Sequence, residues 1–341
     1  MRIAVDAMGG DAAPRTVVGG AVSAVEEDSD ITIVLVGDEE QIQEQLQGAS
    51  YNEDQIHVKH APDVIGMAES AVEAIRNKPK SSINVGVQLL KKGVADALVS
   101  AGNTGATVSA STLNLGLMEQ IHRPGIASPV PHQTGVCSLI DVGANIHCKP
   151  HQLLQYGIMA SVFQRSIYDK DDPAVGLLNI GEEEEKGNEL LQETFPLLKK
   201  SPLNFVGNVE GPAAFSGDVD VLITEGFMGN VILKFLEGCA HNVLNFVQQQ
   251  MKATGEEDQL SRRDKKILQT VKRETDYSEH GGAPLLGVDG ICIICHGRSG
   301  EKAIRNAIRQ AGRLHRHQIN ESILGEIQEI EEELDAVQSE S

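Results

Sequence analysis

Aromatic side chains are scarce in this sequence, since only 3% of its 341 residues are aromatic and tryptophan is absent. The hydrophobic core must therefore consist mainly of alanine, valine, isoleucine and leucine. Such small aliphatic residues, together with 34 glycines, suit helices that pack closely on a parallel sheet. A chain of this length also favours a large α/β unit or two lobes.

Basic residues are also few, because 29 lysines and arginines stand against 49 aspartates and glutamates, giving a net charge of −20. A protein that binds nucleic acid non-specifically needs a basic face to neutralise the phosphates. We therefore expect no nucleic-acid partner. An excess of acidic residues instead keeps a cytosolic protein in solution.

Neither a disulfide framework nor a metal site is expected. The five cysteines are odd in number, and Cys292 and Cys295 form a C-x-x-C motif inside an apolar run. In a strand, residues three apart point to opposite faces, so these two sulfurs would not hold one metal ion. We interpret both as packed strand residues.

Long hydrophobic runs are missing as well. No run reaches the ~20 apolar residues that span a bilayer, and the chain opens with a strand pattern rather than a signal peptide. We expect a cytoplasmic protein that at most touches the inner face of the cell membrane. The phosphate-binding motif G-x-x-x-x-G-K-[ST] is absent, and no G-x-G-x-x-G follows a predicted strand, which weakens any nucleotide-binding interpretation.

One pattern repeats along the chain. A β-branched run ends, a glycine-containing loop follows, and a helical pattern begins. This order predicts a Rossmann-like α/β fold with a doubly wound, mainly parallel sheet and helices on both faces. The predicted strands cover residues 3–5, 31–36, 97–99, 136–140, 175–180, 219–223 and 291–294.

Helical spacing of apolar residues supplies the other elements. It predicts helices over residues 15–25, 67–77, 151–168, 231–251 and 319–337. We expect residues 1–315 to form a single two-lobed α/β domain, from which a helical hairpin at about 240–277 projects. Residues 316–341 would form an acidic C-terminal helix with a frayed tail.

The glycine-rich loops are the candidate ligand site, because ligands of parallel sheets bind beyond the carboxyl ends of the strands. Loop 100–105 is the best candidate for binding phosphate, since glycine lets backbone N–H groups approach an anion and the helix dipole favours it. Loop 226–230 is the second. Either loop could equally be a tight turn.

Charged side chains recur in the same loops. The carboxylates could act as acids, bases or ligands, or simply cap helices. Lys186 closes an acidic run and is a candidate phosphate partner. His296 follows a buried-looking strand and could protonate a leaving group near pH 7 or hydrogen-bond a backbone carbonyl. The carboxylates in question are Asp6, Asp11, Asp141, Glu182 and Glu225.

Eight motifs follow one another in a fixed order over about residues 1–310. They lie at residues 6–14, 100–106, 123–124, 141–145, 179–187, 226–231, 281–288 and 296–297. Together they closely resemble the phosphate acyltransferase family of bacterial phospholipid synthesis. Some positions depart from the family pattern: Met228 replaces a threonine, Pro212 and Ala213 replace Arg-Asp, and His280 replaces a tyrosine.

The resemblance implies a fold similar to isocitrate and isopropylmalate dehydrogenases and to phosphotransacetylase. It implies transfer of a fatty acyl group from acyl carrier protein to inorganic phosphate, which yields an acyl phosphate for fatty acid and phospholipid synthesis. It also implies a homodimer, no cofactor and peripheral membrane contact. A membrane acyltransferase that acts on glycerol 3-phosphate would consume the product.

Phosphate is already a competent nucleophile, so the protein has to position it and stabilise the oxyanion that develops. We hypothesise that backbone N–H groups of residues 103–105 hold phosphate while Lys186 and Asn230 balance its charge. The candidate catalytic residues are Asn103, Asn145 (oxyanion donor), Lys186 and His296 (proton donor). The further candidates for substrate binding are Asp6, Gly9, Gly10, Asp11, Gly102, Thr104, Gly105, Asp141, Glu182, Gly229 and Asn230.

A basic segment interrupts the acidic sequence within residues 252–277. An acidic enzyme needs such a patch to meet an acidic carrier protein, and the same segment could instead contact anionic lipid. A solvated charged helix is the plain alternative. The basic residues are Arg262, Arg263, Lys265, Lys266, Lys272 and Arg273.

Other functions fit part of the pattern. An acyltransferase that uses acyl-coenzyme A would need the same loops. An NAD-dependent metal dehydrogenase would share the fold but lacks its nucleotide fingerprint here. A membrane-associated scaffold for lipid-synthesis enzymes would not need the Gly-Asn loops.

Overall fold

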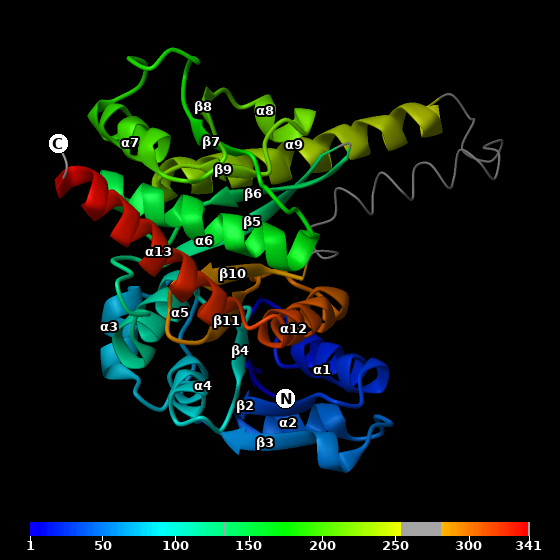
Figure 1. Ribbon diagram of the computed structural model, residues 1–341. Coiled ribbons are helices and arrows are strands. Elements are labelled where there is room, and N and C mark those ends of the chain that lie inside the picture. Colours follow the sequence, from blue (N-terminus) through cyan, green and yellow to red (C-terminus); the bar gives the residue numbers. More distant parts are fainter. Residues whose placement is uncertain (133, 254–280, 340–341) are drawn as a thin grey trace.

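The computed structural model describes residues 1–132, 134–253 and 281–339. Within these residues, eleven strands form one sheet with helices on both faces (Figure 1), which confirms the predicted α/β class. The strands, in their order across the sheet, are β3 (Ile56–His60), β2 (Thr32–Gly37), β1 (Arg2–Asp6), β4 (Ala97–Ser100), β11 (Ile291–Ile294), β10 (Ala283–Leu286), β5 (Gly125–His132), β6 (Gly135–Ile140), β9 (Val221–Ile223), β7 (Val175–Leu178) and β8 (Phe205–Val209).

The sheet has two parallel halves. In the first half β3, β2, β1, β4 and β11 run parallel, and in the second half β6, β9, β7 and β8 do so. Between the halves, β10 pairs antiparallel with β11 and β5, and β5 pairs antiparallel with β6. The two halves therefore run in opposite directions, and the sheet is mainly parallel as predicted.

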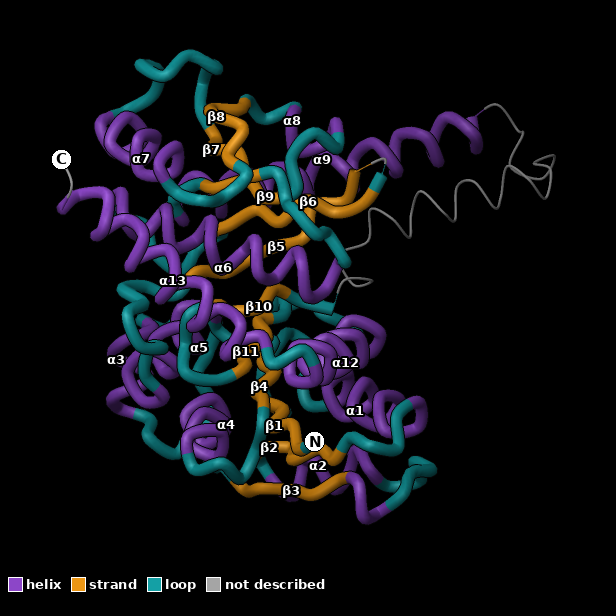
Figure 2. Tube along the Cα trace, in the orientation of Figure 1, coloured by secondary structure: helices purple, strands orange, loops and turns teal. Residues whose placement is uncertain are grey.

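Helices cover both faces of this sheet, as Figure 2 shows. One core contains buried side chains of the helices α1 (Arg15–Glu27), α2 (Glu39–Leu46), α6 (Pro150–Tyr168), α7 (Glu189–Lys200), α12 (Glu301–Arg316) and α13 (Ile319–Ser339). The other core contains side chains of α3 (Ala71–Asn77), α4 (Ser82–Lys91), α5 (Thr104–Ala110), α8 (Ala213–Ser216) and α9 (Gly226–Ala253).

Strand alternation assigns side chains to these two cores. In β1, Ile3 and Val5 belong to the first core and Ala4 to the second. Cys292 likewise lies in the second core and Cys295 in the first, so the C-x-x-C sulfurs do face opposite sides of the sheet. Burial raises the pKa of the Cys292 thiol to about 11 and that of Cys295 to about 12, which keeps both neutral.

The last helix packs on α6, which itself contacts β6 and β9 of the second half. In α13 the residues Ile319, Ile323, Ile327 and Ile330 repeat at helical spacing and are almost completely buried. They pack against α6, and an ion pair of 2.8 Å between Arg165 and Glu326 joins the two helices at the surface. The predicted acidic helix therefore begins at the expected residue.

Some sequence-based predictions differ from the structure. Residues 67–70, predicted to be helical, form a turn, because the Asn103 amide donates hydrogen bonds to the backbone carbonyls of Gly66, Met67 and Glu69. The helix that follows begins only at Ala71. Of the predicted hairpin, residues 240–253 continue α9, and the rest lies outside the described residues. None of the described helices combines the length and apolar character that crossing a bilayer requires.

Strand β5 leaves part of one edge open. Its β10 side has a strand partner only at Gly125 and Ile126, and no described strand pairs with the remainder of that edge. Pro129 and Pro131 lie there, where the hydrogen-bond donor that proline lacks is not needed by a neighbouring strand. This open edge borders the cavity described below.

Candidate active site

Three loops of the first half meet beyond the ends of β1, β4 and β11. Gly9 lies very close to Gly102: a methyl group added to Gly9 would come within 2.5 Å of the amide nitrogen of Gly102. The amide of Asp11 donates a 2.7 Å hydrogen bond to the carbonyl of Gly297. The structure therefore brings three of the sequence-predicted loops into one layer, which we call the loop wall (residues 6–11, 100–105 and 295–298).

Asp6 anchors the loop wall from inside. Its carboxylate accepts hydrogen bonds from the Ser100 hydroxyl (2.7 Å) and from the amide of Met8 (3.2 Å). Burial raises the pKa of Asp6, and hydrogen bonds from Ser82 and Ser100 oppose that rise. Because its oxygens already serve these loops, Asp6 orders the wall rather than reaching the cavity.

Asn103 opens α5 at the edge of this wall. Its side-chain oxygen caps the amide of Ala106 (3.0 Å), while its amide group holds the turn at residues 66–69. The first amides of a helix have no partner within the helix. Among the described residues no acceptor meets the amides of Thr104 and Gly105. These amides, rather than the Asn103 side chain, can receive an anion.

Asp141 has the corresponding place in the second half, at the end of β6. Its carboxylate accepts hydrogen bonds only from backbone amides: those of Ile126, Gly143 and Ala144 at 2.9–3.0 Å and that of Asn145 at 2.7 Å. Burial raises the pKa of Asp141, and these four hydrogen bonds oppose the rise.

The first turn of α9 packs directly on this loop. A methyl group on Gly229 would overlap the backbone carbonyl oxygen of Asp141, and one on Gly226 would come within 2.5 Å of the Asn145 carbonyl. Only glycine fits there, so the two glycines of the second predicted phosphate loop set how closely α9 approaches. We call the face of α9 that carries Asn230, Lys234 and Glu237 the helix wall.

The N-terminus of α9 already holds a carboxylate of the protein. Glu225 accepts hydrogen bonds from the amides of Phe227 (2.7 Å) and Met228 (2.9 Å). A negative side chain at this position satisfies the free amides and the helix dipole. Of the two loops proposed for phosphate, loop 100–105 therefore remains open to an anion, and loop 226–230 is capped.

Asn145 is committed to the protein as well. Its amide group donates to the carbonyl of Pro124 (2.6 Å) and to the hydroxyl of Tyr156 (2.9 Å). An amide has two hydrogens, and both are used. The structure thus gives Asn145 a positioning role beneath the Asp141 loop and leaves no hydrogen for an oxyanion.

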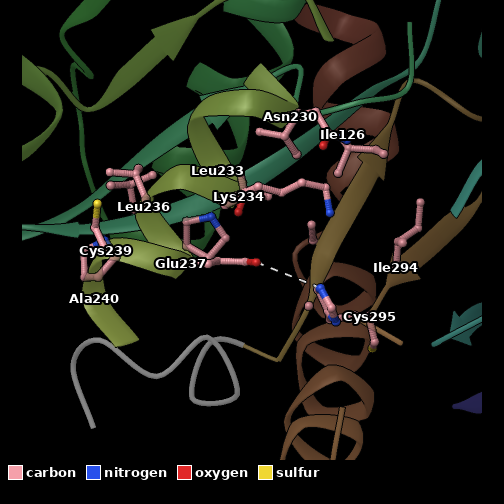
Figure 3. Close-up of a pocket in the computed structure, with 18 of the residues that line it drawn as sticks. Ile126, Asn230, Leu233, Lys234, Leu236, Glu237, Cys239, Ala240, Ile294 and Cys295 are labelled. Carbon is pink, nitrogen blue, oxygen red and sulfur yellow. Dashed lines mark ion pairs between the residues drawn. The ribbon is translucent and has the colours of Figure 1, made fainter. Parts of the chain in front are cut away.

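A cavity of about 500 Å³ lies between the loop wall and the helix wall, beside the open edge of β5 (Figure 3). Its lining is mainly apolar. The apolar lining residues include Ile126, Pro129, Val130, Pro131, Val142, Phe215, Leu233, Leu236, Ala240, Val243, Ala283 and Ile294. A cavity of this size and character suits a long hydrocarbon group.

Six polar or charged residues line the same cavity: Thr104, Ser128, Asn230, Lys234, Glu237 and His296. Glu237 lies 3.9 Å from the Nε2 atom of His296, a contact drawn as a dashed line in Figure 3 that is an ion pair when the ring is protonated. The other ring nitrogen, Nδ1, accepts a hydrogen bond from the amide of Arg298 (3.1 Å). Burial lowers the pKa of His296 below its ordinary value of 6.5, and the Glu237 carboxylate opposes this shift.

Other sequence-predicted residues lie elsewhere. Lys186 is not among the lining residues; it is about half exposed and lies 4.0 Å from Glu183. Glu182 is exposed and also does not line the cavity. The six predicted docking residues between Arg262 and Arg273, and His280, lie outside the described residues.

Sequence analysis missed Lys234 and Glu237. Both lie on a long amphipathic helix, where charged residues ordinarily face solvent. The available signal was their spacing from Asn230, because residues four and seven positions later lie on the same helix face. That spacing becomes informative only once the N-terminus of α9 is known to face the cavity.

This open α/β sheet, with its strand-end loops beside a mainly apolar cavity, has the phosphotransacetylase-like fold. A phosphotransacetylase from Streptococcus pyogenes is similar with a TM-score of 0.61 at 16% identity, covering 93% of this chain and 94% of that one. A 4-hydroxythreonine-4-phosphate dehydrogenase from Klebsiella pneumoniae is similar with a TM-score of 0.52 at 12% identity, covering 92% and 99%. At these identities the likeness establishes the fold.

Sequence similarity is much closer to a particular family. The family model for "fatty acid synthesis protein" matches residues 1–322. Phosphate acyltransferases from Dictyoglomus turgidum and Desulfitobacterium hafniense are 46% and 50% identical, covering 95% and 91% of this chain and 97% and 93% of those proteins. The chain belongs to this fatty acid synthesis family, alongside the phosphate acyltransferases.

Proposed function

We propose that the protein transfers a fatty acyl group from acyl carrier protein to inorganic phosphate. The observation that carries this proposal is the cavity, in which an apolar lining meets the free amides of α5, Lys234 and His296. Such a site binds a ligand with a long hydrocarbon part and an anion at one end. The curated relatives are named for transfer of an acyl group to phosphate, which fits both parts.

The cavity divides the substrates between its walls. The acyl chain lies along the open edge of β5 and the apolar face of α9, where each buried methylene contributes about 0.8 kcal/mol. Phosphate lies at the N-terminus of α5, where the amides of Thr104 and Gly105 receive it. The thioester carbonyl then sits between them, close to Asn230 and His296.

The chemistry is one displacement. An oxygen of hydrogen phosphate attacks the thioester carbonyl carbon, the new carbon–oxygen bond forms, and the carbon–sulfur bond breaks. The proton that phosphate loses ends on the departing sulfur, so acyl phosphate and free thiol account for every atom. Asn230 is the remaining side-chain candidate for stabilising the oxyanion, a contact worth roughly 3 kcal/mol.

His296 moves that proton. Because its pKa is lowered, the ring is neutral near pH 7 and cannot begin as the acid. Because Nδ1 accepts a hydrogen bond from the amide of Arg298, the neutral ring carries its hydrogen on Nε2. The ring takes the proton of phosphate on Nδ1, which gives up that backbone hydrogen bond, and passes the Nε2 proton to the sulfur. Glu237, 3.9 Å from Nε2, stabilises the ring during the moment when it is charged.

Family membership suggests the specific partners of the reaction. Acyl carrier protein is acidic, and the basic residues between Arg262 and Arg273 would receive it. An exposed apolar stripe on α9, formed by Val231, Phe235 and Phe246, supports a homodimer in the cytoplasm or at the membrane periphery. The product would pass to a membrane acyltransferase that acts on glycerol 3-phosphate. No cofactor takes part in this scheme.

The test is phosphate-dependent release of free thiol from palmitoyl-acyl carrier protein, with hydroxylamine trapping of the acyl phosphate. Release that needs phosphate, together with trapped hydroxamate, is the expected result. Equal or greater activity with palmitoyl-coenzyme A would assign the coenzyme A reaction instead. A folded protein inactive with both thioesters would contradict the proposal and favour a scaffold.

Two substitutions test the finer parts. Arg262→Glu with Arg263→Glu should raise KM for the acyl carrier protein and leave KM for phosphate unchanged. If Lys186→Ala lowers activity less than about threefold, Lys186 has no useful contact with substrate, since such a contact contributes about 1 kcal/mol.

A further inference from the structure

The helix wall carries a lysine, Lys234, that stands apart from its charged neighbours. Lys234 lines the cavity, and no hydrogen bond or ion pair joins it to any of the described residues. The neighbouring carboxylate one turn away, Glu237, is directed to His296 instead. Figure 3 shows Lys234 extending from α9 toward the side of the cavity where Ile294 and Cys295 lie.

Two other lysines near predicted site loops, Lys186 and Lys199, differ in this respect. Lys186 lies within 4.0 Å of Glu183, and Lys199 forms an ion pair with Glu184 at 2.5 Å. Neither of them lines the cavity. An ammonium group beside an apolar surface interacts with an anion more strongly than one in open water, because less solvent screens the attraction.

The surroundings of Lys234 specify the anion it can receive. Asn230 lies one turn before it on the same helix face, and Thr104, whose amide is free, lines the same cavity from α5. A compact ion with oxygens in several directions can meet an ammonium, an amide side chain and a helix N-terminus together. Lys234 also opposes protonation of His296, which places its charge near that ring.

We propose that Lys234 is the cation that binds inorganic phosphate in this site, in the role that sequence analysis gave to Lys186. The inference rests on the proposed function, and it names the residue that holds the nucleophile. The ammonium group balances the phosphate charge from the helix wall while the α5 amides hold it from the loop wall. The displacement keeps the same balance of atoms, because Lys234 exchanges no proton in it.

The experiment compares Lys234→Met with Lys234→Arg, Lys199→Met and Lys186→Met in the full-length protein. Binding of inorganic phosphate is measured by isothermal titration calorimetry without an acyl donor. KM for phosphate is then measured with palmitoyl-acyl carrier protein. Circular dichroism confirms that each variant is folded, and Lys234→Arg keeps the charge if the methionine variant fails to fold.

We expect Lys234→Met to raise Kd and KM for phosphate at least about tenfold, because a hydrogen bond to a charged group is lost. Lys234→Arg should recover most of the affinity, and Lys199→Met should leave it unchanged. Unchanged phosphate affinity in Lys234→Met, or a larger loss in Lys186→Met, overturns the inference.

The two proposals fail in different ways. Weaker phosphate binding in Lys234→Met, in a protein that transfers no acyl group, keeps this inference and rejects the proposed function. Phosphate-dependent acyl transfer with an unaltered KM in Lys234→Met does the reverse. A wild-type protein that binds no phosphate overturns both.

Discussion

The loop wall and the helix wall face the same cavity but are built from different parts of the chain. Apart from His296, the loop wall presents mainly backbone to the cavity: its open contacts are the amides of Thr104 and Gly105. Its side chains Asp6 and Asn103 instead hold the loops together. The helix wall presents side chains, namely Asn230, Lys234 and Glu237. Point substitutions therefore alter the chemistry of the helix wall and of His296 directly, and they affect the backbone contacts of the loop wall mainly through stability.

The two walls are also anchored differently. Asp6 shares its carboxylate between hydroxyl groups, which rotate to other acceptors, and amides, which do not. Asp141 accepts from backbone amides at all four of its hydrogen bonds, and α9 rests on its carbonyl. The position of the helix wall thus depends on the Asp141 carboxylate, and the backbone amides that donate to it cannot turn to another acceptor.

The largest effect should come from Gly229→Ala. Its methyl group overlaps the Asp141 carbonyl oxygen, so α9 must move away, at a cost of at least about 3 kcal/mol. We expect little folded protein and no acyl transfer. Gly238→Ala is the matched control on the same helix, because nothing lies within 4 Å of its new methyl group. Thermal unfolding should show that Gly238→Ala is slightly more stable than the wild type. Equal unfolding temperatures for Gly229→Ala and Gly238→Ala would contradict the close approach of α9 to the Asp141 carbonyl.

A second comparison replaces the two anchoring aspartates. Asp141→Ala leaves four backbone amides without an acceptor and should cost about 3 kcal/mol or more. Asp6→Ala should cost at least about 1 kcal/mol less, since its hydroxyl partners turn elsewhere. Thermal unfolding midpoints of both variants check this order, and the reverse order would break the distinction between the anchors.

A more moderate effect is expected from filling the apolar end of the cavity. Ala240→Leu places a larger side chain in the lining and should exclude about two methylenes of a long chain, worth roughly 1.6 kcal/mol. The ratio of kcat/KM for palmitoyl over octanoyl carrier protein should fall about tenfold. Asn242→Leu, exposed on the same helix and outside the lining, should keep the wild-type ratio. An unchanged ratio in Ala240→Leu would place the acyl chain elsewhere.

The smallest effect concerns the proton acceptor. Burial lowers the pKa of His296, so NMR of its ring should give a midpoint below pH 6.5. Glu237 favours the charged ring, and Glu237→Gln should therefore lower the pKa of His296 further. Activity that depends on the neutral ring is lost as pH falls through that midpoint and, in Glu237→Gln, is kept to lower pH. A midpoint above 6.5 in the wild type would contradict the assigned burial.

The strands that are followed by glycine loops could be predicted from the sequence. Both faces of each of these strands are buried, so each consists of a continuous run of apolar residues. The strands β5 and β10 could not be predicted, since Pro129, Pro131 and Pro284 argue against a strand interior. They are tolerated because β5 has an open edge and β10 is short. The edge strands β3 and β8 carry polar residues among their apolar ones, which hides them as well.

The sequence predicted which loops form the site, but it did not predict what each residue in those loops does. Motif order grouped Asn103, Asp141 and Asn230 in one site. In the structure Asn230 lines the cavity, and Asn103 and Asp141 directly precede the lining residues Thr104 and Val142. Whether an asparagine donates to a substrate or to a neighbouring carbonyl depends on distances that no sequence pattern records, as Asn103 and Asn145 illustrate. Lys234 was hidden for the same reason, since its exposure to the cavity depends on how closely Gly229 lets α9 approach.

The order of strands in the sheet has a consequence for synthesis of the chain. The two middle strands, β10 and β11, are nearly the last to be made, yet they pair with β5 and β4, which emerge far earlier. From His132 to Ile294 the ribosome adds roughly 160 residues, which takes on the order of ten to thirty seconds. During that time β4 and β5 each present an edge without its final neighbour, and nascent chains expose two surfaces on which strands of other molecules can pair. A stop codon between residues 133 and 283 would leave both edges permanently without these neighbours.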